Sequence, residues 1–520
     1  MGKKGSALQV NKKDAYRGFD LEIQGLAGIN TTTAPTAIAD NECTAIYNYL
    51  PVGKDLWRKV VAASSVCTCS HNISAFANDV LGGTLYMFVV LSDGSAGTIS
   101  GGVYTQATGA GPGTFNNTGQ AIEITNWQNS VLLIVDAING YFSFTGSTNT
   151  VALIDASLYG TTIAVWTGRV FIGNGRVLNY SAPGSYTDFT ALSGGGYLTI
   201  TNTNLKQQIS KLIPYQDSLY IVGDHAIIAL TGTTISSTPS SWYQMEIFNR
   251  LGVLYPQMLV NFNNTLFLGN EFGVWEVAST QSQKVDYALD LSQFSFQAYP
   301  ACVTQINNLT FYLVPISGYS QVTNTIHSWL LAYCIDLNQF AFLDFGFDIT
   351  GIYTTLSTTD HSLYVWSGAT VYKLFSGTGN VTGYIQSKSF DFGYPFVMKT
   401  LQYILLNIYM RSGTPSFTVT GYAQQLSQPF ISAVGIQNTF TYQYRLMSYS
   451  PSYPTTVIGL TNSYGQLMAF QSTQQVGVGT NIFNISVGGE IVSWSISETS
   501  NAVYDILSTF IEGNIGRAIR

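Results

Sequence analysis

Residues 129–144 read NSVLLIVDAINGYFSF, two apolar runs separated by a polar turn that ends in glycine. The runs, Val131–Val135 and Tyr141–Phe144, are each the length of one β-strand, and their β-branched and aromatic residues favour strands. Asp136–Gly140 supplies the polar residues and glycine that a tight connection between antiparallel strands requires. The stretch predicts a β-hairpin whose strands are buried on both faces, because neither run alternates with polar residues.

The same unit recurs along the chain. Its leading apolar residue returns after 39 to 54 residues, and a four-stranded propeller blade needs roughly 40–50 residues. A lone hairpin is marginally stable, whereas sheets packed around an axis bury both of their faces. The repeat predicts an all-β fold with a β-propeller of six or seven blades over residues 61–380; unrelated hairpins of a β-sandwich are the alternative. The leading residues are Leu85, Val131, Val170, Leu219, Leu266, Leu309 and Leu363.

The composition excludes several classes of protein. Only 9% of the 520 residues are charged, against about 25% in an ordinary soluble domain. Aromatic residues make up 13% of the chain and the net charge is only −7, which excludes a disordered chain. Helical bundles need Glu, Lys and Arg in bulk, and these residues are scarce here.

The charge is unevenly spread. Residues 61–380 hold 7 basic and 17 acidic groups, whereas residues 1–60 hold 8 of the 21 basic groups. A protein that grips DNA through its phosphates shows a basic stripe, and this region shows the reverse. The excess predicts either a mildly acidic surface or a negative wall past which DNA slides without being held.

The flanks do not follow the repeat. Residues 1–60 are predicted to be an N-terminal arm and docking segment that binds a neighbour or the first blade, with one short helix over residues 37–46. Residues 381–520 contain clean alternation, as in Phe417–Tyr422 and Ile491–Ile496. They predict a small C-terminal β-sandwich, with a final strand over Tyr504–Ile511 that returns to the propeller and a short basic tail.

No motif for chemistry stands out. The histidines have no metal-type spacing, and no phosphate-binding loop, dinucleotide fingerprint or serine-nucleophile elbow is present. A propeller glycosidase needs a carboxylate pair and usually an arginine cluster. We therefore predict no catalytic, cofactor-binding or metal-ligating residues, no cofactor and no enzymatic activity. The residues considered are His71, His225, His327 and His361, with Arg169, Arg176 and Arg250 as the arginines of the propeller region.

The five cysteines have irregular spacing and are odd in number, which does not suit a disulfide framework. Cys67-Thr-Cys69 is one residue short of a metal-type pair, and no second pair follows it. We predict buried free thiols.

Three segments carry a resemblance to a known family. The first is Gly25–Thr31 with Pro35, Ala39–Cys43 and Tyr47–Pro51; the second is Thr167–Gly175 with Tyr180–Phe189; the third is Ser389–Pro395. Together they touch about 50 residues. They resemble the tail-nozzle proteins of short-tailed bacteriophages, also described as head-stabilisation or tail-tube-B-like proteins, and the order of domains is similar over the whole chain.

The resemblance implies a structural virion protein, made in the cytoplasm of the bacterial host. Six copies would form a ring below the portal and adaptor, extend the DNA-ejection channel and help to retain the packaged genome. Tail needle, fibre or spike proteins would lie around or below it. Double-stranded DNA would pass without sequence-specific binding, and no small-molecule substrate is implied.

Two other functions compete with this interpretation. A phage receptor- or glycan-binding propeller would use exposed aromatic residues such as Trp242, Trp275 and Trp366. A propeller glycosidase would need two carboxylates on the channel.

Overall fold

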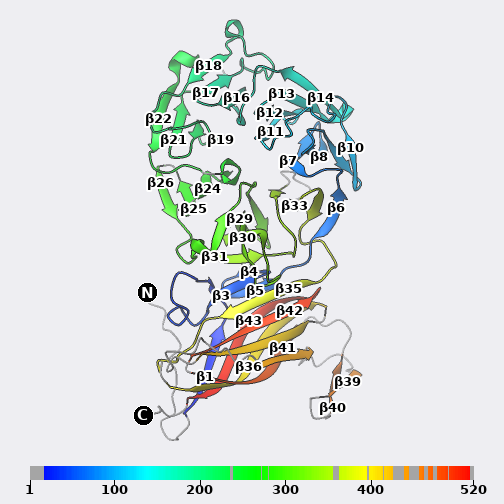
Figure 1. Ribbon diagram of the computed structural model, residues 1–520, viewed down its shortest axis with the longest axis vertical. Helices are drawn as coiled ribbons and strands as arrows, with labels where there is room; N and C mark the ends of the chain where they lie inside the picture. Colours follow the sequence, from blue (N-terminus) through cyan, green and yellow to red (C-terminus); the bar gives the residue numbers. More distant parts are fainter. Residues whose placement is uncertain are drawn as a thin grey trace.

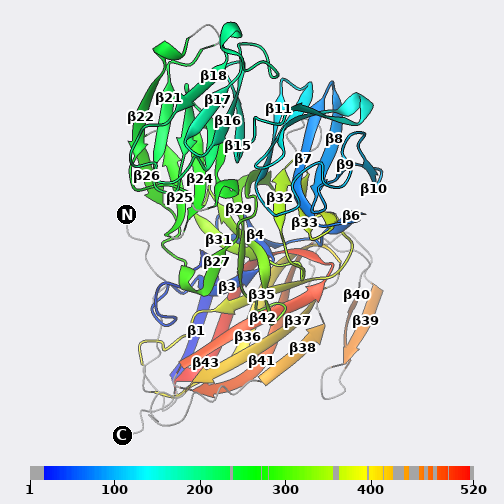
Figure 2. The same ribbon diagram turned by 45° about the horizontal axis from the view of Figure 1, so that its top comes forward.

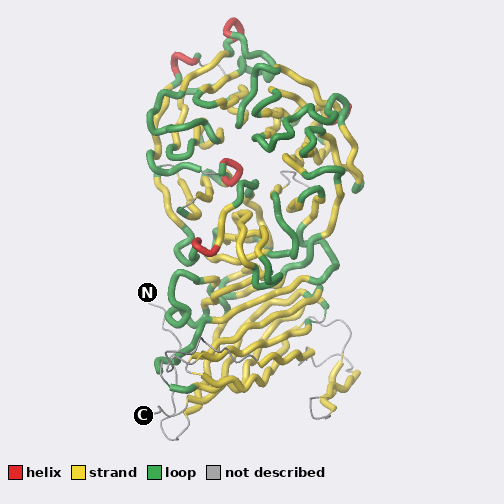
Figure 3. The backbone as a smooth tube through the Cα atoms, viewed as in Figure 1, coloured by secondary structure: helices red, strands yellow, loops and turns green. Residues whose placement is uncertain are grey.

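The fold is seen in a computed structural model that describes residues 17–234, 238–253, 255–270, 272–278, 280–354, 362–394, 397–413, 415–424, 438–443, 456–461, 467–471, 477–489 and 491–515. Strands dominate these residues (Figure 3). Helices within them are limited to five 3-10 turns of three residues, and none has the length and apolarity that a bilayer crossing requires. The turns are η1 (Gly146–Thr148), η2 (Ala191–Ser193), η3 (Pro239–Ser241), η4 (Pro256–Met258) and η5 (Leu291–Gln293).

Seven blades, each of four antiparallel strands, surround a common axis and form a β-propeller (Figure 1). Blades 1 to 5 each use four consecutive strands, blade 6 belongs to a larger sheet, and blade 7 takes its last strand from earlier in the chain. Blade 1 is β7 (Ile73–Leu81), β8 (Thr84–Leu91), β9 (Ala96–Ser100) and β10 (Val103–Gln106); blade 2 is β11 (Ile122–Trp127), β12 (Val131–Asp136), β13 (Gly140–Thr145) and β14 (Thr150–Asp155); blade 3 is β15 (Thr162–Trp166), β16 (Arg169–Asn174), β17 (Val177–Tyr180) and β18 (Gly196–Thr199); blade 4 is β19 (Lys211–Tyr215), β20 (Ser218–Val222), β21 (Ile227–Thr231) and β22 (Tyr243–Phe248); blade 5 is β23 (Val260–Phe262), β24 (Thr265–Asn270), β25 (Gly273–Ala278) and β26 (Gln281–Lys284); blade 6 is β28 (Cys302–Ile306), β29 (Leu309–Tyr319), β30 (Ile326–Cys334) and β31 (Gln339–Leu343); blade 7 is β32 (Gly351–Thr354), β33 (Leu363–Ser367), β34 (Thr370–Lys373) and β6 (Ser64–Thr68).

The first strand of each blade lies toward the axis, against the first strand of the next blade. The ring closes where β32 meets β7 and where β6 pairs with β34. All seven leading residues of the sequence repeat, from Leu85 to Leu363, fall in the second strand of a blade. The predicted propeller is therefore confirmed, with seven blades, and the repeat marks its second strands.

The cores of the propeller lie between neighbouring blades. One cluster packs Phe88 of blade 1 against Phe144 of blade 2, another packs Phe171 of blade 3 against Leu219 of blade 4, and a third packs Phe76 of blade 1 against Trp366 of blade 7. Each sheet thus has apolar side chains on both faces. This arrangement explains the continuous apolar run of β12, in which all six residues are buried.

The second domain is a β-sandwich, as predicted, but both ends of the chain build it (Figures 1 and 2). One sheet has the order β4-β5-β43-β36-β41, with β1 also paired to β43; the other contains β3, β35, β42, β37 and β38. The bounds are β1 (Arg17–Gln24), β2 (Gly28–Ile29), β3 (Glu42–Tyr47), β4 (Tyr49–Gly53), β5 (Leu56–Lys59), β35 (Val381–Ser387), β36 (Lys399–Ser412), β37 (Ser416–Gln424), β38 (Asn438–Gln443), β41 (Gly477–Gly489), β42 (Ile491–Ser500) and β43 (Val503–Ile515), beside a separate hairpin of β39 (Thr456–Thr461) and β40 (Leu467–Gln471). A further strand, β27 (Phe294–Phe296), pairs with β29 of blade 6.

Three expectations about the flanks are corrected. Residues 17–59 are not a separate docking arm, because they supply strands to both sandwich sheets; residues 1–16 lie outside the described residues. The helix over 37–46 is wrong, because Glu42–Tyr47 is strand β3, held between β35 and β31 with Ile46 fully buried. The strand over Tyr504–Ile511 does not return to the propeller: β43 pairs with β36, β1 and β5.

The two domains share one sheet. β3 pairs with β31 at Tyr47 and Phe342, so the sheet of blade 6 continues into the sandwich. Arg58 of β5 donates to the Asp505 carboxylate (2.7 Å) and to Asn307 of blade 6 (3.2 Å). The sandwich therefore meets the propeller at its circumference, beside blades 6 and 7 (Figure 1).

Candidate functional site

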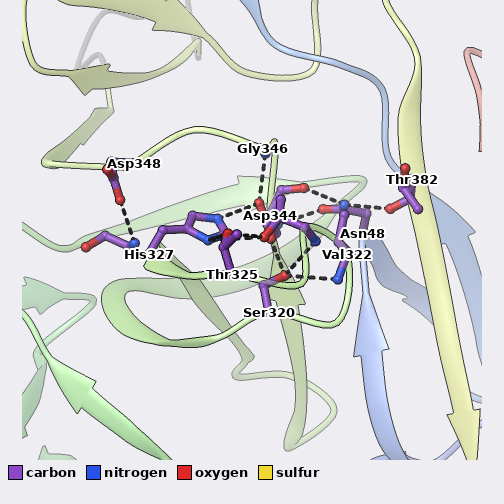
Figure 4. A network of polar contacts seen from close by, with 11 residues as sticks. Asn48, Ser320, Val322, Thr325, His327, Asp344, Gly346, Asp348 and Thr382 are labelled. Atoms are coloured by element: carbon purple, nitrogen blue, oxygen red, sulfur yellow. Dashed lines mark hydrogen bonds and ion pairs between the residues drawn. The ribbon is translucent and has the colours of Figure 1, made fainter.

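A polar network lies where blade 6 meets the sandwich (Figure 4). His327 Nε2 lies 3.0 Å from Asp344 Oδ1, and the Ser320 hydroxyl donates to Asp344 Oδ2. His327 Nδ1 lies 3.3 Å from the hydroxyl oxygen of Thr323 and 3.4 Å from that of Thr325. A hydroxyl, an imidazole and a carboxylate in this order contain the elements of an acid–base site.

The remaining hydrogen bonds of this network connect blade 6 to the sandwich. Asn48 Nδ2 donates to the carbonyl oxygens of Asp344 (2.6 Å) and Thr382 (2.8 Å), while Asn48 Oδ1 accepts from the Asp344 N–H (2.8 Å). The Gly346 N–H donates to Asp344 Oδ1 at 2.8 Å. Asp344 is fully buried and its carboxylate is satisfied within the protein. The network joins blade 6, the N-terminal segment and β35, and we call it the junction latch.

The other histidines are dispersed. His71 lies 3.3 Å from Asp93 and His225 lies 3.8 Å from Asp224, both on partly exposed turns of different blades; His361 is outside the described residues. Among the described residues no group of three or more His, Cys, Asp and Glu side chains could hold a metal ion.

Two of the propeller's arginines support blade 3. Arg169 is buried and donates to the carbonyl oxygens of Ser181 and Gly194, both at 2.8 Å. Arg176 donates to the carbonyl oxygen of Ile200. Arg250 is exposed between blades 4 and 5. The three arginines therefore do not gather around the axis.

The cysteines are buried free thiols, as predicted. Burial raises the pKa of Cys43 to about 12 and that of Cys69 to about 12. Since the thiolate is the reactive form of cysteine, these side chains serve as packing residues.

The wall of the propeller axis carries few charges. The described inner strands hold two carboxylates, Asp79 and Glu123. Burial raises the pKa of Asp79, against a hydrogen bond from Tyr353 that opposes the shift. Glu123 pairs with Lys211 and accepts from the Ile163 N–H at 3.1 Å. These two acids connect one blade to another, and the described inner strands carry no further carboxylate that would make an acidic lining along this axis.

The three tryptophans considered for glycan binding differ in their exposure. Trp242 and Trp366 are only 8% and 2% exposed and pack in the cores between blades. Trp275 lines an open pocket between blades 4 and 5. Of the three, only Trp275 is placed to meet a ligand.

The outermost strands of blades 1 to 4 display large apolar side chains on the circumference of the propeller. Val103 on β10 is 63% exposed, Leu153 on β14 is 54% exposed, Tyr197 on β18 is 72% exposed and Tyr243 on β22 is 61% exposed. These strands are the last in their sheets, so among the described residues one backbone edge of each has no further strand beside it, although Thr108 forms a single bridge with Thr150 on β14. We call this series the outer-strand surface. Blade 6 lacks such an edge, because β3 covers β31.

The fold defines this chain as a seven-bladed β-propeller joined to a β-sandwich. No family model matches it, and no curated protein matches it. Among solved structures it is similar to one described as U3-55K, with a TM-score of 0.40 and 11% identity over 60% of this chain and 98% of that chain. It is also similar to the WD40 repeats of RRP9, with a TM-score of 0.39 and 10% identity over 61% of this chain and 99% of that chain. Similarity at this level transfers no function, and the seven sheets themselves define the propeller.

Proposed function

We propose that this protein is a non-catalytic structural subunit of the tail of a short-tailed phage, the nozzle, and that six copies close into a ring on an adaptor. The outer-strand surface is the observation that carries this proposal. Exposed apolar residues on open strand edges are normally protected, because such edges pair with other chains. In a chain with 9% charged residues, a closed assembly covers these edges.

The position of two resembling segments also supports the proposal. Lys388, which precedes Ser389, donates to Asp40 Oδ1 and to the carbonyl oxygen of Ile38, both at 2.8 Å. The Ser389 N–H donates to the carbonyl oxygen of Pro35 at 2.9 Å. The described start of the third segment therefore lies against the first segment, although more than 300 residues separate them in the sequence.

In this proposal DNA passes along the axis of the ring of six. The propeller's own axis has no part in this proposal, because the first strands of successive blades lie against one another around it. Acidic groups that face the ring axis would keep the duplex from binding during ejection. Replacing those acids with lysine is expected to slow ejection, and an unchanged rate would remove this part of the proposal.

The decisive experiment measures mass in solution, by native mass spectrometry or light scattering, with and without the candidate adaptor. We expect a monomer near 56.5 kDa that becomes a closed sixfold ring on the adaptor. The double variant Tyr197→Asp with Tyr243→Asp should stay monomeric, whereas Tyr287→Asp, an equally exposed tyrosine outside the outer strands, should assemble. A stable trimer that binds host glycan without the adaptor would replace this proposal with the receptor-binding function.

A further inference from the structure

A pocket opens where blade 4 meets blade 5, with a cavity volume of about 320 Å³. One wall is the end of β22 and the segment that follows it, and the other is formed by residues of blade 5; blades 4 and 5 are neighbours in Figures 1 and 2. The residues that matter below are Glu246, Phe248, Arg250, Asn270, Phe272 and Trp275. This volume lies at the lower end of the range for small-ligand sites.

The aromatic part of the pocket is held in place before any ligand arrives. Phe272 is 60% exposed, and Phe248 and Trp275 are half-buried. Asn270 Oδ1 accepts both from the Phe272 N–H (2.9 Å) and from the Trp275 indole N–H (3.1 Å), and the Asn270 side chain is itself buried. The buried Asn270 amide thus orients the Trp275 ring directly and holds the backbone of Phe272 beside it. Rings that are held in position form a ready platform for an apolar surface.

The polar part of the pocket has unused hydrogen-bonding groups. Glu246 Oε2 accepts from the side-chain amides of Asn204 (2.7 Å) and Asn202 (2.8 Å). Those bonds hold the pKa of Glu246 below its ordinary value, so the carboxylate stays ionised. Within the described residues Glu246 Oε1 has no hydrogen bond, and the exposed Arg250 guanidinium has no partner. The pocket therefore offers one acceptor and a fork of donors beside the aromatic platform.

We propose that this pocket binds one neutral hexose unit of a polysaccharide. A hexose presents a flat C–H face that packs on an aromatic ring, and its edge carries hydroxyls that donate to a carboxylate and accept from a guanidinium. Among the described lining residues the charges of Glu246 and Arg250 offset each other, which favours a neutral sugar over an acidic one. Glu246 is the single carboxylate among the described lining residues, and our proposal is for binding alone, since glycoside hydrolysis needs two carboxylates.

This site is independent of the proposed nozzle function. A half-open pocket with one sugar subsite gives weak binding per copy, and several copies in one assembly would strengthen it through avidity.

The test titrates the purified full chain with neutral trisaccharides of glucose, galactose and mannose, followed by saturation-transfer NMR and tryptophan fluorescence. We expect at least one trisaccharide to bind with millimolar affinity and sialyllactose to bind no better. Phe272→Ala and Arg250→Ala should each weaken binding at least tenfold. Both side chains are exposed, so these variants should keep the wild-type melting temperature, which a thermal scan checks.

The matched control is Tyr197→Ala, an exposed aromatic residue of blade 3 that does not line the pocket, and this variant should bind the sugar unchanged. The proposal is overturned if no neutral trisaccharide binds, if an acidic sugar binds more tightly, or if Phe272→Ala leaves binding intact. None of these outcomes bears on the mass of the assembly, so this proposal and the nozzle function fail separately.

Discussion

Val371 of β34 pairs with Cys67 of β6, so the seventh blade takes its outermost strand from the segment that precedes the first blade. Cys67 is buried with Phe76 of blade 1 and Trp366 of blade 7. The pairing makes the ring a closed object, in which the first and last parts of the propeller sequence depend on each other.

We expect Cys67→Asp to open this closure. The carboxylate would stand without a partner in an apolar core, which costs about 3–5 kcal/mol of unfolding free energy. Thr68→Asp, on the exposed neighbour in the same strand, should change stability by less than about 0.5 kcal/mol. Thermal unfolding and limited proteolysis measure the effect; equal stability of the two variants would show that β6 does not secure the ring.

Asp505 anchors the strand that links both ends of the sandwich. Burial alone would raise its pKa, but hydrogen bonds from Arg58 and Arg411 hold the pKa of this carboxyl below its ordinary value. A lowered folded-state pKa stabilises the protein above the unfolded-state pKa, and this stabilisation is lost as the pH falls through the folded-state value.

Asp505→Asn should therefore lower the unfolding free energy at pH 7 by about 1–3 kcal/mol, as expected for charge-assisted hydrogen bonds. The difference from wild type should shrink in acid. Denaturant unfolding between pH 7 and pH 3 measures it, with Glu512→Gln, an exposed carboxylate on the same strand, as control. A difference that stays constant with pH would contradict the ionic origin.

Asp79 is expected to behave in the opposite way. Burial raises its pKa, so its stabilising contribution is complete below the unfolded-state pKa and is lost as the pH rises through the folded-state value. Asp79→Asn keeps a partner for Tyr353 without a buried charge, and should raise the unfolding free energy at pH 7 by about 1–2 kcal/mol. At the lowest pH at which the protein stays folded the gain should vanish. Thermal scans against Asp217→Asn, an exposed turn carboxylate, measure this; a loss of stability at pH 7 would contradict it.

The junction latch depends on Asn48, which is fully buried and has a φ of +60°. Asn48→Gly removes three hydrogen bonds but tolerates this backbone, whereas Asn48→Ala removes the same bonds and keeps a Cβ in the left-handed region. We expect a loss of about 2–4 kcal/mol for glycine and about 1 kcal/mol more for alanine. Calorimetry should show the single transition splitting into separate propeller and sandwich transitions. A single transition at the wild-type temperature would mean that the latch does not couple the domains.

Much of the propeller could be predicted from the sequence, because each hairpin of a blade lies within one short, continuous stretch of residues. A unit such as 129–144 contains both strands of a hairpin and the turn between them, and its burial on both faces requires an apolar run. The repeat of Leu85 through Leu363 then follows from the size of one blade.

The strands and sites that could not be predicted depend on contacts with residues that are far away in the sequence. Glu42–Tyr47 has the composition of a short capped helix, but its pairing with residues 384–387 makes it a strand, because tertiary contacts override weak local propensity. Nothing within residues 64–68 indicates that they complete blade 7. The junction latch draws Asn48, His327 and Asp344 from three separate segments, and the pocket of Trp275 exists only once blades 4 and 5 are packed together.

The assembly of the sandwich from both ends of the chain sets an order in time. β1, β3 and β5 leave the ribosome early, but their partners β35, β36, β42 and β43 are translated last. At about 5–20 residues per second, the wait is roughly 25 to 100 seconds. The blades, including the closure by β6, need no residue beyond Lys373. During synthesis the residues of the ring are therefore all available while β1, β3 and β5 still lack their sandwich partners. These three unpaired strands are the segments that a cellular chaperone would bind.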